Sequence, residues 1–197
     1  MIRQRVSHIR QRFEGDRNRG AVLIESAIVI TLILTMFFGV LEFGMLLRSR
    51  HALAEATRTG ARAASSLPRQ DGYQTAAAEA VGASLRGSIP STSVVSLVVY
   101  KADPNTGFPI SGTLSNCTGS CYRFDWDAAA EQFNVVPGYT WAASDQDACG
   151  DVGNTDYVGV ALTGTHDFVT SFWSDSAGIS DRTVMRLEPV IDSAICS

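Results

Sequence analysis

The sequence predicts an α+β fold in which one long N-terminal helix packs on a small antiparallel sheet. Three observations indicate it: an apolar run over residues 21–47, an amphipathic pattern that continues it to residue 70, and strand-like segments in the rest of the chain. Helical segments followed by several strands are typical of α+β domains with an antiparallel sheet. We therefore expect four regions: a basic cytoplasmic leader (1–20), a transmembrane helix (21–47), its amphipathic continuation (48–70) and an extracytoplasmic α+β domain (71–197).

Charge is distributed unevenly along the chain. Residues 1–20 contain six arginines and two acidic residues, whereas residues 72–197 contain fourteen acidic residues and five basic ones. Because arginine-rich flanks of apolar helices stay on the cytoplasmic side, we expect a single-pass protein of the cytoplasmic (inner) membrane, with its C-terminal domain outside the cytoplasm. An acidic domain also argues against nucleic-acid binding, which requires a basic surface.

The apolar run reads AVLIESAIVITLILTMFFGVLEFGMLL, and only Glu25 and Glu42 interrupt it. As a helix it extends about 40 Å at roughly 1.5 Å per residue, which exceeds the roughly 30 Å of bilayer hydrocarbon. The run is also longer than the apolar part of a removable secretory signal. A carboxylate inside a membrane is costly unless it lies near an interface or has a partner. Glu25 is therefore either an interfacial residue or a functional one.

Small side chains recur every four residues in both halves of the predicted helix. In the transmembrane half such a ridge lets a second helix approach closely, although it could also simply face lipid. In the amphipathic half the small stripe should lie on the sheet, and Pro68 and Gly72 should end the helix. The eight positions are Ala27, Thr31, Thr35, Gly39, Ala52, Ala56, Gly60 and Ala64.

The remaining residues predict a short helix and several strands. QTAAAEAVGASLR, residues 74–86, is helical by composition, and Gly87 and Pro90 should end it. Segments of the rest are rich in β-branched residues or alternate apolar and polar side chains, as strands do. Strands are expected at 93–100, 122–127, 156–162 and 183–188, with loops at 101–120 and 137–155.

All four cysteines lie in the second half of the chain, in the part that we expect to be exported. An even count in that setting favours two disulfides. Four cysteines permit three pairings, and we favour Cys117–Cys121 with Cys149–Cys196. A zinc site and buried free thiols are the alternatives.

No motif in the sequence indicates catalysis. His166 is the only histidine in residues 71–197, and no nucleophile elbow, phosphate loop or zinc-protease motif accompanies it. We expect it to be a surface or capping residue. The acidic loop with Asp145, Asp147, Asp151, Asn154 and Asp156 is interpreted as solvated, with calcium binding as the alternative. The chain is therefore expected to be no enzyme, with no cofactor, no metal and no small-molecule substrate.

Three further motifs lie between Arg19 and Ala64. Gly20 precedes an apolar run with an early glutamate, residues 39–44 read GVLEFG, and residues 58–64 read RTGARAA. This stretch resembles the TadE-like family, minor pilins or pseudopilins of the Tad (Flp) type IV pilus system. The segment DRTVMRLEP, residues 181–189, is similar to the family's C-terminal ending. Ser26 departs from the pattern, because type IV pilins often carry a bulky residue after the early glutamate.

The resemblance implies a pilin-like, ladle-shaped subunit that acts in pilus biogenesis and adhesion. A prepilin peptidase would cut between Gly20 and Ala21, and the new Ala21 amine would meet Glu25 of a neighbouring subunit and set the axial register. Implied partners are the membrane, other pilins or pseudopilins, the prepilin peptidase and the inner-membrane assembly platform, and the processed protein could enter the surface pilus. The alternatives are an unprocessed anchor with an interfacial Glu25, and a permanently anchored extracytoplasmic binding domain unrelated to pili.

Overall fold

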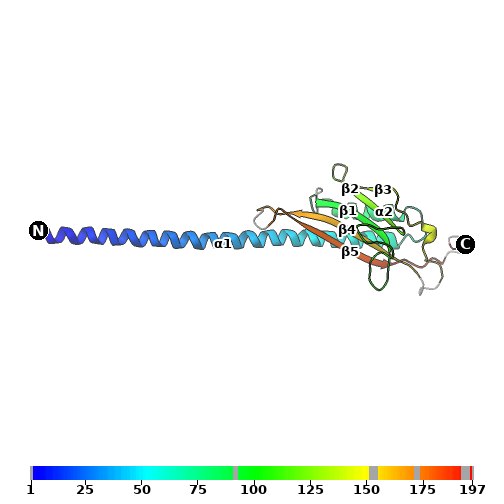
Figure 1. The fold of residues 1–197 in the computed structure, drawn as a ribbon, viewed down its shortest axis with the longest axis horizontal. Coiled ribbons are helices and arrows are strands. Elements are labelled where there is room, and N and C mark those ends of the chain that lie inside the picture. Colours follow the sequence, from blue (N-terminus) through cyan, green and yellow to red (C-terminus); the bar gives the residue numbers. More distant parts are fainter. Residues whose placement is uncertain (1, 91–92, 151–154, 171–173, 192–195, 197) are drawn as a thin grey trace. The chain divides into compact units, whose positions relative to one another are not determined.

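The computed structural model describes residues 2–90, 93–150, 155–170, 174–191 and 196, with side chains from residue 19 onward. Two compact units, Met1–Gly44 and Met45–Ser197, are distinguished by their internal contacts, and each is described separately. The elements are α1 (Ile2–Ser65), α2 (Tyr73–Leu85), β1 (Val94–Ala102), β2 (Cys121–Asp127), β3 (Gln132–Val136), β4 (Tyr157–Asp167) and β5 (Ser176–Arg186) (Figure 1). The predicted α+β class is confirmed.

The first unit is helical, as the apolar composition of α1 requires. Its large apolar side chains between Val22 and Phe43 are 45–72 % exposed. An 18-residue window within Arg19–Ser65 reaches a mean hydropathy of 2.4, so the helix is long and apolar enough to cross a membrane. Apolar area of this extent is stable in lipid and not in water. The structure thus supports a single-pass anchor.

The second unit contains one antiparallel sheet with the strand order β3-β2-β1-β4-β5 (Figure 1). β1 is central, and its register places Leu97 opposite Phe124 of β2 and Leu162 of β4. β4 and β5 form a long hairpin in which Tyr157 pairs with Arg186 and Asp167 pairs with Ser176. β3 and β5 are therefore the edge strands of the sheet.

One face of the sheet packs against the C-terminal part of α1 and against α2. Alternate residues along a strand point to the same face, so Leu97 and Val99 of β1 join this core while Val98 and Tyr100 face the opposite side. Several core residues of α1 are small, and Ala56 and Ala64 are fully buried. Small side chains allow the helices to approach the sheet closely.

The opposite face of the sheet is covered in part by the loop between β1 and β2. Tyr100 is buried there and donates a hydrogen bond from its hydroxyl to the carbonyl oxygen of Gly107 at 2.9 Å. Cys117 and Cys121 pack in the same cluster. The loop therefore supplies a second, smaller core.

The sheet has one strand more than the sequence predicts, and two of the predicted strands are too short. The sequence did not predict β3 because QFNVV is too short to show a clear pattern. The strand is stabilised by cross-strand pairs with β2, such as Trp126 opposite Phe133. The last strand starts at Ser176 instead of 183, and β4 extends to Asp167 instead of 162. Glycine and polar residues in these extensions do not have a strand-like pattern. They are extended because β4 and β5 pair with each other as a hairpin.

Candidate functional site

The residues expected to act in processing and assembly lie in the first unit and are all on α1. Gly20, Ala21 and Glu25 are helical and exposed. A Cβ atom added to Gly20 would meet nothing within 4 Å. Because they are exposed, these three residues are accessible to other molecules.

The small-residue ridge of α1 has internally satisfied hydroxyl groups. The Thr31 hydroxyl donates to the carbonyl of Ala27 at 2.8 Å, and the Thr35 hydroxyl donates to the carbonyl of Thr31 at 2.9 Å. Threonines bonded in this way carry no unpaired donor into lipid. Gly39 continues the ridge, and an added Cβ there would meet nothing within 4 Å. The ridge is compatible with close approach of a second helix.

The amphipathic half of α1 is attached to the sheet by its small stripe and by buried polar contacts. Gly60 faces Val81 of α2 and Val160 of β4, whereas Ala52 is only half-buried. The hydroxyl of the buried Thr57 donates to the Asp181 carboxylate of β5 at 2.7 Å, and the Thr183 hydroxyl lies 3.0 Å from it. These contacts hold the C-terminal half of α1 in one register on the domain.

A cavity of about 620 Å³, here called the neck cavity, opens near the beginning of the second unit. One side of the cavity is formed by Met45, Arg48 and Ser49 of α1. Ile89 and Pro90, which follow α2, form a second side, and the end of β4 forms a third. The β4 residues are His166 and Asp167.

His166 is buried, with 8 % of its surface exposed, so the expectation of a surface or capping residue was wrong. It lies near the end of the long strand β4, whose extension the sequence pattern did not reveal, and its ring packs edge-on against Phe168 at 5.3 Å between centroids. Its Nδ1 atom is 3.1 Å from Ser49 Oγ. This contact places the end of β4 beside α1.

The Ser49–His166 pair does not have the arrangement of a catalytic dyad. In serine hydrolases the nucleophile gives its proton to a histidine whose other nitrogen is oriented by a carboxylate. Here the Ser49 hydroxyl donates to the carbonyl of Met45 at 3.2 Å, and His166 Nε2 has no hydrogen-bond partner among the described residues. The pair is therefore a packing and hydrogen-bonding contact.

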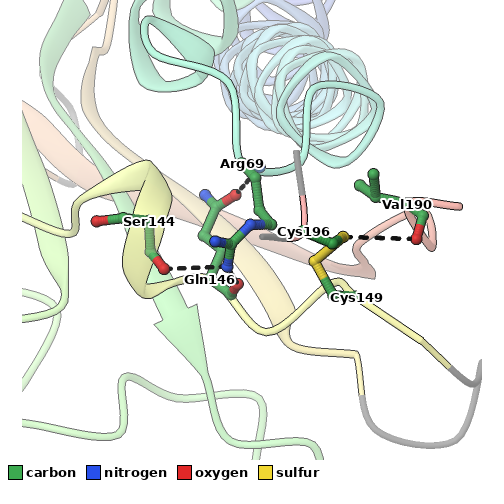
Figure 2. Close-up of a disulfide and its surroundings, with 6 residues drawn as sticks. All are labelled: Arg69, Ser144, Gln146, Cys149, Val190 and Cys196. Carbon is green, nitrogen blue, oxygen red and sulfur yellow. Dashed lines mark hydrogen bonds between the residues drawn. A yellow bond between two sulfur atoms is a disulfide. The ribbon is translucent and has the colours of Figure 1, made fainter. Parts of the chain in front are cut away.

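Two disulfides stabilise the domain, as the cysteine count predicted. Cys117 pairs with Cys121, and Cys149 pairs with Cys196, which is the pairing that we favoured. Figure 2 shows the second bridge beside Arg69, whose guanidinium donates to the carbonyls of Ser144 and Gln146 at 3.0 and 2.9 Å. The two Arg69 hydrogen bonds tie the middle of the loop between β3 and β4 to the segment that follows α1.

The acidic loop has no calcium-like arrangement among its described residues. Asp156 forms an ion pair with Lys101 at 2.7 Å, and its second oxygen accepts the backbone N–H of Asp147 at 2.8 Å. Asp151 and Asn154 lie outside the described residues. Within the described part of the chain, no three potential metal ligands come together. Asp156 therefore has a structural role.

An exposed apolar helix followed by a disulfide-containing antiparallel sheet is typical of an α+β protein with a single-pass membrane anchor. Residues 20–62 match the model of the TadE-like protein family. The match confirms the resemblance drawn from the motifs between Arg19 and Ala64, and it is consistent with a protein of the Tad pilus system. No curated protein and no solved structure matches the chain.

Proposed function

We propose that the chain is a structural subunit of a Tad-type type IV pilus, a minor pilin or pseudopilin that acts in pilus biogenesis and adhesion. The observation that carries the proposal is the TadE-like match over residues 20–62, which covers the exposed apolar helix and the start of the small stripe. Such a helix anchors the subunit in the inner membrane and is available for packing against other subunits when it is extracted.

Processing between Gly20 and Ala21 would give the helix a charged end. The new Ala21 amine is positive and Glu25, four residues later, is negative. Each charge is costly in an apolar setting when it is alone, and each is neutralised when the amine of one subunit meets Glu25 of the next. Glu25 is exposed and can therefore reach a neighbouring subunit.

The implied partners act on different parts of the chain. The prepilin peptidase would recognise the leader and Gly20, while other pilins or pseudopilins and the assembly platform would contact the apolar helix. The ridge of Ala27, Thr31, Thr35 and Gly39 is a suitable surface for the latter contact, because its hydroxyls are already bonded within the helix.

The test compares Glu25→Ala with a matched control, Glu55→Ala, which removes an exposed carboxylate from the amphipathic half of the same helix. Glu25→Ala should leave the protein in the membrane fraction and remove it from sheared filaments, whereas Glu55→Ala should leave both unchanged. Normal incorporation of the Glu25→Ala protein would contradict the assembly role.

N-terminal sequencing and intact mass of the membrane form test processing separately. A chain that begins at Ala21 supports the pilin role. A chain that retains its first twenty residues in piliated cells supports the alternative of a permanently anchored binding domain.

A further inference from the structure

The neck cavity has a polar wall with unused hydrogen-bonding capacity. Ser49 has one hydroxyl proton, which it donates to the Met45 carbonyl at 3.2 Å. His166 Nδ1 lies 3.1 Å from the same hydroxyl oxygen, so both contacts are satisfied when Nδ1 carries the imidazole proton. In the neutral ring Nε2 is then a hydrogen-bond acceptor, and it has no partner among the described residues.

No described residue supplies a hydrogen-bond donor to this acceptor. His166 is more than nine-tenths buried and lines the cavity. A buried polar atom without a partner destabilises the fold. The unpartnered lone pair of Nε2 adds negative potential beside the cavity, which favours a cationic ligand over an anionic one at this end.

Two charged side chains of opposite sign also line the cavity. Asp167 follows His166 on β4, and Arg48 precedes Ser49 on α1. Both are exposed, and neither forms an ion pair within the described part of the chain. The carboxylate favours a cationic donor such as an ammonium group, whereas the guanidinium favours a phosphate. The cavity is thus complementary to a zwitterion.

The apolar residues of the cavity indicate the source of that zwitterion. Met45 belongs to the last three residues of the apolar run 21–47, and Ile89 and Pro90 face the same space. A bilayer core requires about 20 helical residues, so the end of a 27-residue run falls at the headgroup layer. A volume of about 620 Å³ is within the range of small-ligand sites.

We propose that the neck cavity binds the headgroup of an amine-bearing phospholipid such as phosphatidylethanolamine. The ammonium group lies against the Asp167 carboxylate at the end of the cavity that holds His166, and the phosphate lies against the Arg48 guanidinium. This function goes beyond pilus assembly, since it gives the anchored subunit a fixed lipid contact before any filament forms.

The test is native mass spectrometry of the full chain, reconstituted with phosphatidylethanolamine, with phosphatidylglycerol, or with detergent plus inorganic phosphate. The variants Arg48→Ala and Asp167→Asn change exposed residues, so they should fold. Their controls are Arg50→Ala and Asp175→Asn, which change exposed residues outside the cavity. The wild type should retain phosphatidylethanolamine at least about tenfold more than phosphatidylglycerol. Arg48→Ala should reduce that retention about tenfold, and Asp167→Asn should abolish the preference between the lipids.

Several results would overturn the proposal. Equal retention of the two lipids by the wild type would exclude recognition of the amine, and equal retention by Arg48→Ala and Arg50→Ala would exclude the cavity. Inorganic phosphate that displaces the lipid would indicate a simple anion site. Variants that retain the lipid but do not enter filaments would indicate that the cavity binds a neighbouring subunit and not a lipid. Because lipid retention is measured without filaments, a failed pilus role would not affect the result.

Discussion

Gly60 of α1 lies so close to Val81 of α2 that a Cβ atom added to the glycine would overlap Val81 Cγ2. The added atom would also lie 3.4 Å from Val160 Cγ1 of β4. Both helices and the sheet therefore meet at a position that accepts only hydrogen as a side chain. Glycine is unfavourable within a helix, so its presence here reflects packing.

Replacing Gly60 with alanine should destabilise the domain. The overlap with Val81 costs about 1–3 kcal/mol through overpacking, and the better helix propensity of alanine returns at most about 1 kcal/mol. Thermal unfolding of the detergent-solubilised protein should show a lower midpoint. Gly44→Ala is the control, because an added Cβ there meets nothing within 4 Å. Equal midpoints for the two variants would show that α1 and α2 do not pack as described.

Thr57→Val should also destabilise the domain, by about 1–3 kcal/mol, because it leaves the Asp181 carboxylate without its hydroxyl donor. Chemical unfolding measures the change. Thr59→Val is the control: Thr59 is exposed, and its hydroxyl donates to the carbonyl of Glu55 on its own helix. In the double variant Thr57→Val with Asp181→Asn, the losses should be less than additive. Strict additivity would mean that the two residues do not interact.

The two disulfides should differ in their contributions. Cys149–Cys196 joins residues 47 apart, whereas Cys117–Cys121 joins residues four apart. Chain-entropy arguments give about 4 kcal/mol for the longer loop and about 2 kcal/mol for the shorter one. Replacing both cysteines of a pair with serine and comparing midpoints of unfolding tests this order. A larger loss from the 117–121 pair would contradict it.

The domain should lose stability in alkaline solution. Burial raises the pKa of Tyr100 from 10.0 to about 12, and burial likewise raises the pKa of Tyr73 well above its usual value. The unfolded chain therefore releases these protons at a lower pH than the folded chain does. The stability that the neutral phenols provide is complete below about pH 10 and falls as the pH rises toward 12.

Unfolding measured from pH 8 to 12 tests the role of Tyr100. Tyr100→Phe should show a shallower alkaline loss, together with a lower stability at pH 8 because the bond to Gly107 is absent. Tyr139→Phe, at a half-buried tyrosine, is the control for removal of a phenol hydroxyl elsewhere in the domain. An unchanged slope in Tyr100→Phe would argue against a buried phenol at this position.

Local patterns were sufficient to predict the long helix, α2, the α+β class and most of β1 and β2. The apolar run and the four-residue stripe are properties of neighbouring residues, and they require no knowledge of the rest of the chain. The favoured cysteine pairing is also the one in the structure, although spacing alone did not exclude the other two. The processing site, Glu25 and the ridge remain predictions that rest on residue type and on the TadE-like match.

The other features of the fold depend on contacts between segments that are distant in the sequence. β3 and the first half of β5 are extended because β2 and β4 pair with them, and their own residues carry too weak a pattern to indicate it. His166 is buried and faces Ser49, 117 residues earlier, because the β4–β5 hairpin extends along α1. The neck cavity follows from the same long-range pairing. Hydrophobic periodicity identifies which face of an element is buried, but it does not identify which element covers that face.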